Sequence, residues 1–223
     1  MVRKQASWKF IEKYYNDDLD ERNTPETKFY LSWMKKIRGQ KILCLGCGPN
    51  LYDDIQFFGN IPKEIVGIDI NKNNINFLKK STHPNILKSK RVLENKKIKV
   101  KLIVGDILKL KREFINQFDT VYAIGVVGMF RENKLKKLLN LIYLYLNPSG
   151  LFLDVDWTEC QLSDEKYKER QNFEWYSKDG PTIKKIGKLI VQTNFKIAKH
   201  LVYNVPNKKE YLWGKIYGFL AKK

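Results

Sequence analysis

The chain has 223 residues, a length typical of one domain that can bury a core without disulfides or metal ions. Its three cysteines do not suit a small secreted disulfide scaffold, no signal-peptide pattern opens the sequence, and no apolar run approaches the roughly 18 residues of a membrane span. The formal charge of +18 permits a polyanion partner, but Lys outnumbers Arg by 35 to 7, which favours solvated lysine faces over bidentate phosphate contacts. We therefore expect a cytoplasmic, single-domain protein over residues 1–223 with no membrane partner.

Two helices are expected at the start of the chain, over residues 7–16 and 24–38. Thr24 is a plausible N-cap of the second helix, with Pro25 at its first position and Gly39 after its end. Residues 1–39 would then form a helical cover for a core that occupies residues 40–223.

From residue 40 onward, short apolar runs alternate with helical patterns. The runs are mostly continuous in their apolarity, which is typical of parallel strands buried on both faces. The clearest helix spans residues 132–146, where Leu and Ile recur at spacings of three and four, and residues 147–150 should stop it and turn the chain. Five strands are expected, at residues 41–45, 64–68, 100–104, 120–124 and 151–155.

The end of the chain is different. Residues 195–203 and 211–221 are two strand-like runs, and the link between them is too short for a crossover helix, so they should pair as an antiparallel hairpin. An insert is expected at about residues 157–189, where it could cover a site. The pattern predicts an α/β fold with a doubly wound, Rossmann-like, mostly parallel sheet.

Residues 88–101 are the most lysine-rich stretch of the chain. Charges are mixed there and aromatic residues are few, so we expect a solvated loop that leads into the strand at 100–104. A polyanion site at this stretch remains an open alternative.

A glycine turn and two acidic strand ends form the sharpest functional pattern. Gly46 and Gly48 follow the first strand directly, which allows close approach of backbone to a ligand. Asp69 ends the second strand, where its carboxylate can accept hydrogen bonds from two ribose hydroxyls. Asp106 ends the third strand, placed to reach an adenine amino group, with Ile107 beside the base plane.

A dinucleotide-binding enzyme would share the first two features, but Leu51 stands where that fingerprint requires a small residue. S-adenosylmethionine has no phosphate, and its ribose, adenine and amino-acid tail match the two acids and the glycine turn. The sequence therefore predicts S-adenosylmethionine as the cofactor.

In this motif order, residues 40–157 resemble the class I S-adenosylmethionine-dependent methyltransferases. The resemblance implies a seven-stranded sheet with a reversed final hairpin strand, and cofactor contacts at Gly46, Gly48, Asp69, Asp106 and Ile107. We also expect Cys47, Ile70 and Ala123 to line the same site.

A narrower likeness is to the nicotinamide, phenylethanolamine and indolethylamine N-methyltransferases. It rests on residues 13–15, 46–52 and 69–74, and it implies cofactor contacts for Tyr14, Tyr15, Tyr52 and Asn74. The tyrosines at 14 and 15 could instead anchor the first helix. The insert and the basic charge depart from that family.

Methyl transfer from a sulfonium is an in-line displacement, so the protein mainly has to align the reactants and exclude water. Asp154 and Asp156 share one face of a strand, where one could orient a cationic or amide substrate and the other could take a proton. We name Asp156 and Tyr15 as catalytic candidates, and Asp154, Asp156, Trp157 and Trp175 as substrate contacts. Alternatively, the two acids form ordinary strand-end hydrogen bonds or caps, and the aromatic residues belong to the core.

The Cys-x-x-Cys spacing of Cys44 and Cys47 is not read as a metal or redox site, because Cys44 falls in a buried strand and no second pair exists. His83 and His200 have no partner that suggests metal or triad chemistry.

The sequence thus predicts a small-molecule methyltransferase acting at nitrogen. The alternatives are an RNA or protein methyltransferase that uses the basic surface, an aminocarboxypropyl transferase of the nicotianamine synthase type, and a cofactor-binding protein without methylation. An Asn-Pro-Pro-Tyr signature of base methylation is absent after the fourth strand, which disfavours nucleic acid as the methyl acceptor.

Overall fold

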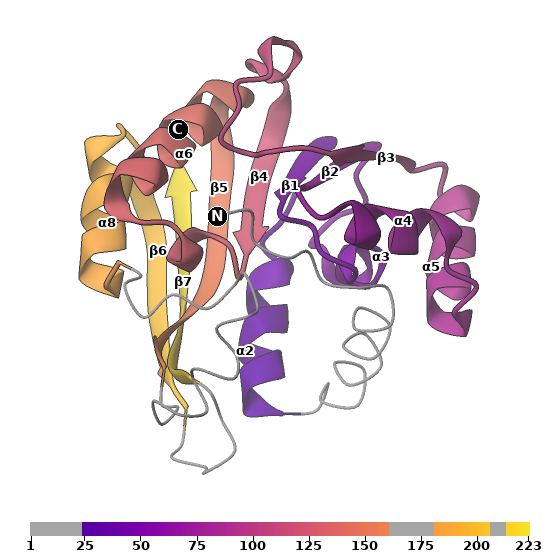
Figure 1. The fold of residues 1–223 in the computed structure, drawn as a ribbon, viewed down its shortest axis with the longest axis horizontal. Helices are drawn as coiled ribbons and strands as arrows, with labels where there is room; N and C mark the ends of the chain where they lie inside the picture. Colours follow the sequence, from indigo (N-terminus) through magenta and orange to yellow (C-terminus); the bar gives the residue numbers. More distant parts are fainter. Residues whose placement is uncertain (1–23, 161–180, 206–212) are drawn as a thin grey trace.

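The computed structural model describes residues 24–160, 181–205 and 213–223, and the strands of these segments form one seven-stranded sheet (Figure 1). Its order is β3-β2-β1-β4-β5-β7-β6, with β7 antiparallel to both β5 and β6 and all other pairs parallel. The predicted α/β, Rossmann-like fold with a C-terminal hairpin is confirmed. The strands are β1 Lys41–Leu45, β2 Glu64–Asp69, β3 Lys99–Val104, β4 Phe118–Ile124, β5 Leu146–Cys160, β6 Lys196–Asn204 and β7 Trp213–Lys222.

Helices cover both faces of the sheet. Apolar side chains of α2, α3, α4 and α5 pack on one face, and those of α6 and α8 pack on the other. The helices are α2 Pro25–Met34, α3 Leu51–Asp54, α4 Lys72–Lys80, α5 Pro84–Asn95, α6 Glu132–Tyr145 and α8 Ile183–Gln192, with 3-10 turns η1 Ile55–Phe57, η2 Arg112–Phe114 and η3 Val127–Met129. No helix among the described residues is long and apolar enough to cross a membrane.

Strand burial follows position in the sheet. The central strands β1, β2 and β4 are almost wholly buried, as continuous apolarity predicts. β3 is an edge strand, and its Lys99, Lys101 and Val104 side chains are exposed. The expectation that all these strands are buried on both faces is therefore wrong for β3, because no strand covers its outer edge.

Helix α2 begins as predicted and ends earlier. The Thr24 hydroxyl accepts a hydrogen bond from the Thr27 backbone N–H at 3.2 Å, and Pro25 occupies the first turn. The helix stops at Met34 and not at residue 38, because the following residues turn toward β1 through Gly39, whose φ is +123°. The helix expected at residues 7–16 lies outside the described residues.

The lysine-rich stretch is a helix for most of its length, so the predicted loop is wrong. Helix α5 buries Ile86, Ser89 and Leu93, which lie three and four residues apart on one side. These three positions are enough to dock the helix, while its basic residues lie elsewhere on its surface. The His83 Nδ1 atom accepts a hydrogen bond from the Asn85 N–H at 3.3 Å and caps the helix.

The junction between α6 and β5 also departs from the prediction. Residues 147–150 stop the helix, but they lie within β5 as an irregularity, because Phe118 pairs with Leu146 and Thr120 pairs with Leu151. Ser149 adopts a φ of +64° there. Beyond the predicted residues, β5 continues to Cys160 because β7 pairs along its length.

The hairpin of β6 and β7 lies within one or two residues of its predicted bounds. Helix α2 rests directly on it, since a Cβ atom on Gly218 would lie 2.2 Å from Cε2 of Trp33. The described part of the expected insert contains α8, which packs against α6 and β6. Residues 161–180 lie outside the described segments.

Candidate active site

The turn after β1 has the backbone geometry that its glycines predict. Gly46 and Gly48 have φ values of +63° and +53°. A Cβ atom on Gly46 would lie 2.5 Å from Cγ2 of Val126, whereas one on Gly48 would meet nothing within 4 Å. Packing therefore requires glycine at position 46, and position 48 leaves open space beside the backbone that a ligand could approach.

Asp69, at the end of β2, accepts three hydrogen bonds at this edge of the sheet. Its Oδ2 accepts hydrogen bonds from the Gly48 N–H at 2.8 Å and from Nδ2 of Asn74 at 3.1 Å. Its Oδ1 accepts one from the Asn71 N–H at 2.7 Å. Burial raises the pKa of the Asp69 carboxyl, and the donors from Asn71 and Gly48 oppose that shift. The structure thus brings three predicted site residues, Gly48, Asp69 and Asn74, into one hydrogen-bonded group.

Asn71 joins this group and was missed by the sequence argument. Its side-chain oxygen accepts a hydrogen bond from the Asn73 N–H at 2.9 Å and caps helix α4. An asparagine two residues after a strand-end acid and directly before a helix is a recognisable N-cap signal. The cap fixes the start of the helix that carries Asn74.

Asp106 and Ile107 lie beyond the neighbouring strand β3, at the same edge of the sheet. The Gly105 N–H donates to the Asp69 carbonyl oxygen at 2.9 Å, which ties the two strand ends together. Asp106 is half-buried and its Oδ1 accepts from the Leu108 N–H at 2.8 Å. Ile70 is 56% exposed beside Asp69. An exposed apolar side chain next to a strand-end acid suits the flat face of a base.

Three further predicted cofactor residues, Cys47, Tyr52 and Ala123, are buried. Tyr52 packs in the core on the α3 side, with Nζ of Lys90 5.6 Å from its ring centroid. Burial raises the pKa of the Cys44 and Cys47 thiols well above their usual value, so neither is an activated thiolate. Within the described residues, no cluster of three or more His, Cys, Asp or Glu could hold a metal ion.

Asp156 holds the segment that follows β4. Its Oδ2 accepts a hydrogen bond from the Gly128 N–H in η3 at 2.6 Å, and its Oδ1 accepts one from the Trp157 N–H at 2.8 Å. Burial raises the pKa of the Asp156 carboxyl to about 6, against the opposing effect of these N–H donors. The carboxyl is thus partly protonated in mildly acidic solution.

Asp154 is fully buried beside Asp156, on the sheet face that α6 and α8 cover. Its pKa is raised well above the usual value by burial and by the Asp156 carboxylate, with a smaller opposing effect of the Tyr217 hydroxyl. Neither Asp154 oxygen, nor the Tyr217 hydroxyl, makes a well-formed hydrogen bond to another described residue. Tyr217 comes from β7, and no sequence signal pointed to it.

Of the remaining predicted site residues, the structure describes one, Trp157. Trp157 is half-buried at the end of β5, and its ring lies against Gly125 after β4, where a Cβ atom would be 3.3 Å from Cζ3. Tyr14, Tyr15 and Trp175 lie outside the described residues.

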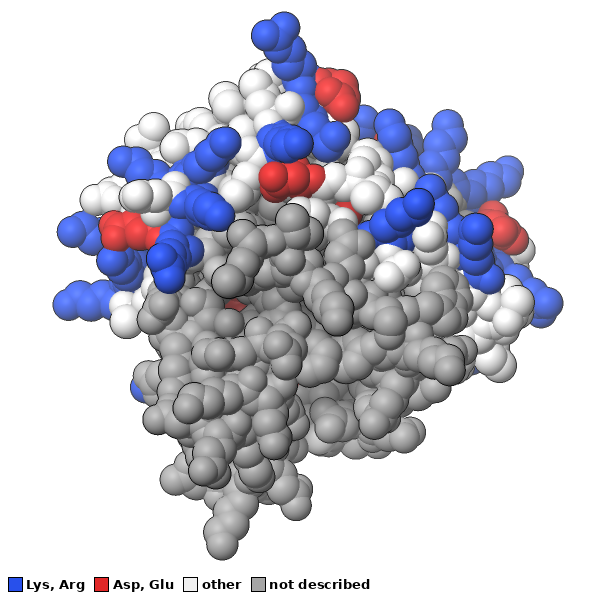
Figure 2. Space-filling view, in the orientation of Figure 1, with Lys and Arg blue, Asp and Glu red and all other residues white. Residues whose placement is uncertain are grey.

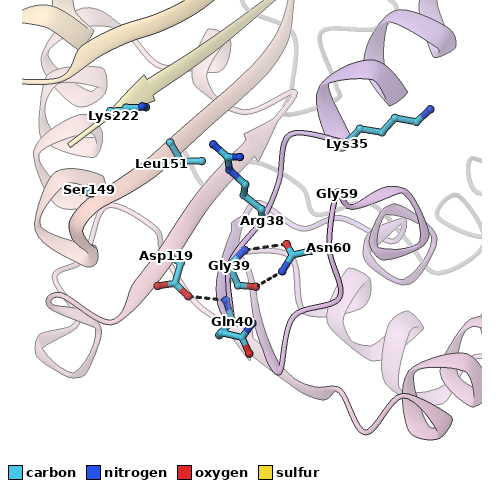
Figure 3. Close-up of a pocket in the computed structure, with 10 residues that line it drawn as sticks. All are labelled: Lys35, Arg38, Gly39, Gln40, Gly59, Asn60, Asp119, Ser149, Leu151 and Lys222. Atoms are coloured by element: carbon cyan, nitrogen blue, oxygen red, sulfur yellow. Dashed lines mark hydrogen bonds between the residues drawn. The ribbon is translucent and has the colours of Figure 1, made fainter.

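A separate pocket of about 700 Å³ opens at the opposite edge of the sheet (Figure 3). It is lined by the residues before β1 and by the beginnings of β4 and β5, and Arg38 extends into it toward Leu151. Asp119 there accepts hydrogen bonds from the Gln40 and Lys41 N–H groups at 2.7 and 2.9 Å. The amino-terminal ends of parallel strands are not where ligands bind in open α/β sheets, so this pocket is distinct from the candidate active site.

Comparison with known proteins agrees with the fold described above. Phosphoethanolamine N-methyltransferase 2 from Haemonchus contortus, in complex with phosphomonomethylethanolamine and S-adenosylhomocysteine, has a TM-score of 0.65 at 16% identity; the match covers 99% of this chain and 59% of that one. This chain therefore spans about three fifths of that protein's length. An S-adenosylmethionine-dependent methyltransferase from Archaeoglobus fulgidus has a TM-score of 0.58 at 15% identity, with 94% of this chain and 99% of that chain covered. Both likenesses show the fold.

No curated protein sequence matches this chain. The family model for thiopurine S-methyltransferase matches residues 5–161, which is more than half of the sequence and includes the glycine turn and every strand-end acid described above. The protein therefore belongs to the thiopurine S-methyltransferase family and is an S-adenosylmethionine-dependent methyltransferase.

Proposed function

We propose that this enzyme methylates a small molecule at nitrogen, with the cofactor seated over the group formed by Gly48, Asp69 and Asn74. The observation that carries the proposal is the Asp69 carboxylate, which joins the glycine turn to the first turn of α4. In the full proposal the cofactor also contacts residues on both sides of this group, namely Tyr14, Tyr15, Gly46, Cys47, Tyr52, Ile70, Asp106, Ile107 and Ala123.

The donors and acceptors at this edge fit S-adenosylmethionine. A carboxylate has about four acceptor positions, and Asp69 uses three of them in the protein itself. One position therefore remains for a ribose hydroxyl, and a second becomes available if Asn74 turns its amide toward the ligand. The open space beside Gly48 suits a close backbone contact with the amino-acid tail, and no cluster of phosphate-binding cations is needed.

Bound S-adenosylmethionine supplies a methyl group on a sulfonium, which the acceptor takes by in-line displacement. The chain's own contribution is to position the acceptor, to exclude water and to receive a proton. In this proposal Asp156 and Tyr15 are the catalytic candidates, and Asp154, Trp157 and Trp175 contact the substrate. Asp156 is suited to proton transfer because its raised pKa, about 6, is close to neutral pH.

A second acceptor atom has support of its own. The name of the matching family refers to S-methylation of thiopurines, which favours a thiol as the methyl acceptor. A polarisable thiolate needs less help from a general base than an amine does, since it reacts already deprotonated. The two acceptors therefore make different demands on Asp156.

The experiment is a two-step test on the full chain. Calorimetry with S-adenosylmethionine and S-adenosylhomocysteine should give micromolar dissociation constants, and a nicotinamide dinucleotide should give no heat. Labelled cofactor is then incubated with matched aromatic amines and aromatic thiols, and the products are identified by mass. Transfer to amines supports the nitrogen acceptor, transfer only to thiols replaces it with sulfur, and transfer to neither overturns the proposed substrate class.

A further inference from the structure

A dense group of basic residues surrounds the β3 edge of the sheet. Part of it borders the proposed cofactor site, since Nζ of Lys90 lies 5.6 Å from the centroid of the Tyr52 ring and the Lys109 N–H donates to the Asp106 carbonyl oxygen at 3.1 Å. Residues 79–112 contain twelve of the chain's 42 Lys and Arg residues but two of its 24 Asp and Glu residues. This segment alone thus carries +10 of the formal +18 charge. We call its basic residues the β3-edge band: Lys79, Lys80, Lys88, Lys90, Arg91, Lys96, Lys97, Lys99, Lys101, Lys109, Lys111 and Arg112.

Most side chains of the band face solvent. All of its side chains are exposed except those of Lys90 and Lys111, which are half-buried. None of the twelve forms an ion pair with another residue in the described segments. Figure 2 shows blue side chains gathered over the flank where α4, α5 and β3 lie in Figure 1, with few red ones among them. The band is therefore a field of unneutralised positive charge.

The band also wraps around the edge of the sheet and does not lie on one plane. Helix α5 covers the sheet face on which Val100 and Leu102 pack. Lys99 and Lys101 alternate with those residues, so they point to the opposite face, the one toward which Ile103 packs. Basic groups thus lie on both sides of the exposed strand and at its rim.

Two ordinary explanations do not account for the band. Lysines on an edge strand prevent pairing with another chain, but Lys99 and Lys101 alone would suffice for that. A general excess of lysine would spread over the molecule, whereas the other 189 residues hold 30 basic and 22 acidic residues. Residues 79–112 are thus unusual in two ways, because basic residues are abundant there and acidic residues are scarce.

We infer that the β3-edge band binds the phosphate backbone of a nucleic acid strand. A flexible polyanion can follow charges around a curved edge, whereas a lipid surface meets basic groups on one plane. Affinity would come from counterion release as phosphates are neutralised, and sequence preference would be weak. The strand would be a docking partner and not the methyl acceptor, so this inference does not depend on the proposed function.

The test compares two variants that remove the same charge from different faces. The band variant is Lys88→Gln, Arg91→Gln, Lys96→Gln and Lys101→Gln, all at exposed positions. The matched control is Lys134→Gln, Lys136→Gln, Lys184→Gln and Lys188→Gln, on the exposed surfaces of α6 and α8. Binding of a labelled, mixed-sequence RNA of about 16 nucleotides, within the range of single-strand site sizes, is followed by fluorescence anisotropy.

We expect the full chain to bind this RNA with an affinity that falls steeply between about 50 and 200 mM salt. The band variant should lose at least tenfold in affinity and show a salt dependence shallower by about 0.7 for each phosphate contact removed, while the control stays within about threefold of the parent chain. Cofactor binding measured by calorimetry should be the same in all three proteins, which shows that each is folded. Equal losses in both variants, no RNA binding at about 50 mM salt, or binding to anionic lipid vesicles with none to RNA would each overturn the inference.

Discussion

The backbone N–H of Gly48 donates a hydrogen bond to Oδ2 of Asp69 at 2.8 Å, and together with the Cys47 N–H, which donates to the Ile68 carbonyl oxygen at 3.0 Å, it links the loop after β1 to the end of β2. The same carboxylate holds the Asn71 N–H at the start of α4. The Asp69 side chain therefore positions both the glycine turn and the start of α4, two elements expected to contact the cofactor. Asp69 would act both as a ligand contact and as a support for the neighbouring contacts.

Asp69→Ala should weaken cofactor binding by about 1.5–3 kcal/mol, roughly 10- to 150-fold, the range for hydrogen bonds made to a charged group. Calorimetry with S-adenosylhomocysteine measures the change. Asp119→Ala is the matched control, because Asp119 also accepts two backbone N–H groups but lies at the opposite edge of the sheet. The control should lower the melting temperature and leave affinity intact; wild-type affinity in Asp69→Ala would move the ribose site elsewhere.

The two glycines of the turn should respond differently to alanine. Gly46→Ala places a methyl group against Val126 and also forces alanine into a left-handed backbone, so it should destabilise the fold by about 2–5 kcal/mol. Gly48→Ala meets no neighbour, so its cost to stability should be limited to about 1–2 kcal/mol for the left-handed backbone. Its methyl group would enter the space assigned to the cofactor and should reduce affinity at least tenfold. Urea unfolding and calorimetry on both variants separate these effects, and an unchanged affinity in Gly48→Ala would argue against cofactor contact there.

The raised pKa of Asp156 predicts a stability change with pH. A carboxyl that binds its proton more tightly in the folded state makes the free energy of unfolding fall as pH rises from its unfolded pKa, about 4, to its folded pKa, about 6. Asp156→Asn cannot titrate, so the decline over this interval should be smaller in that variant. Urea titrations at several pH values measure it, and parallel pH profiles for the two proteins would contradict the buried-carboxyl assignment.

The same residue makes a kinetic prediction. If Asp156 accepts a proton from the substrate, kcat/KM should rise with pH through about 6, and the Asn variant should lose both that inflection and most of its turnover. If Asp156 only holds η3 through the Gly128 N–H, the variant should retain turnover with a modestly altered KM. Steady-state rates across pH distinguish these two roles.

The expected cover over the site can be tested although most of its residues lie outside the described segments. We expect Tyr14, Tyr15 and residues 157–178 to gain hydrogen-exchange protection when S-adenosylhomocysteine binds, because a closed cover would keep water from the displacement. Tyr15→Ala should lower turnover more than it lowers the melting temperature. Unchanged exchange in both regions would show that neither closes over the cofactor.

The features that followed directly from sequence were those with a local physical cause. The glycine turn after β1, the strand-end position of Asp69 and the Thr24 cap each depend on residues close in the chain. The mostly parallel sheet and the final hairpin followed from the spacing of apolar runs, whereas the order of the strands was not predicted. These signals were sufficient for the fold class, and the cofactor roles of Gly48 and Asp69 stay predictions.

The features that sequence reasoning missed depend on contacts between residues far apart in the chain, or on elements with few buried positions. Tyr217 meets Asp154 only because β7 pairs with β5 across the sheet, and no pattern near either residue records that pairing. Helix α5 was mistaken for a loop because three buried positions among many charges give a weak periodic signal. The exposure of β3 likewise depends on its place at the edge and not on its composition.

The position of β7 has a consequence for how the molecule assembles. β7 lies between β5 and β6, and its pairing with them is antiparallel on both sides. Since β7 follows both partners in the chain, neither can complete its hydrogen bonding until residues 213–222 have emerged during synthesis, and β6 has no other strand partner in the described sheet. The parallel part of the sheet can form first, while the edge of β5 that pairs with β7 stays exposed. Docking of β7 is therefore expected to be a slow step in folding, and the unpaired edge of β5 can promote aggregation until β7 has docked.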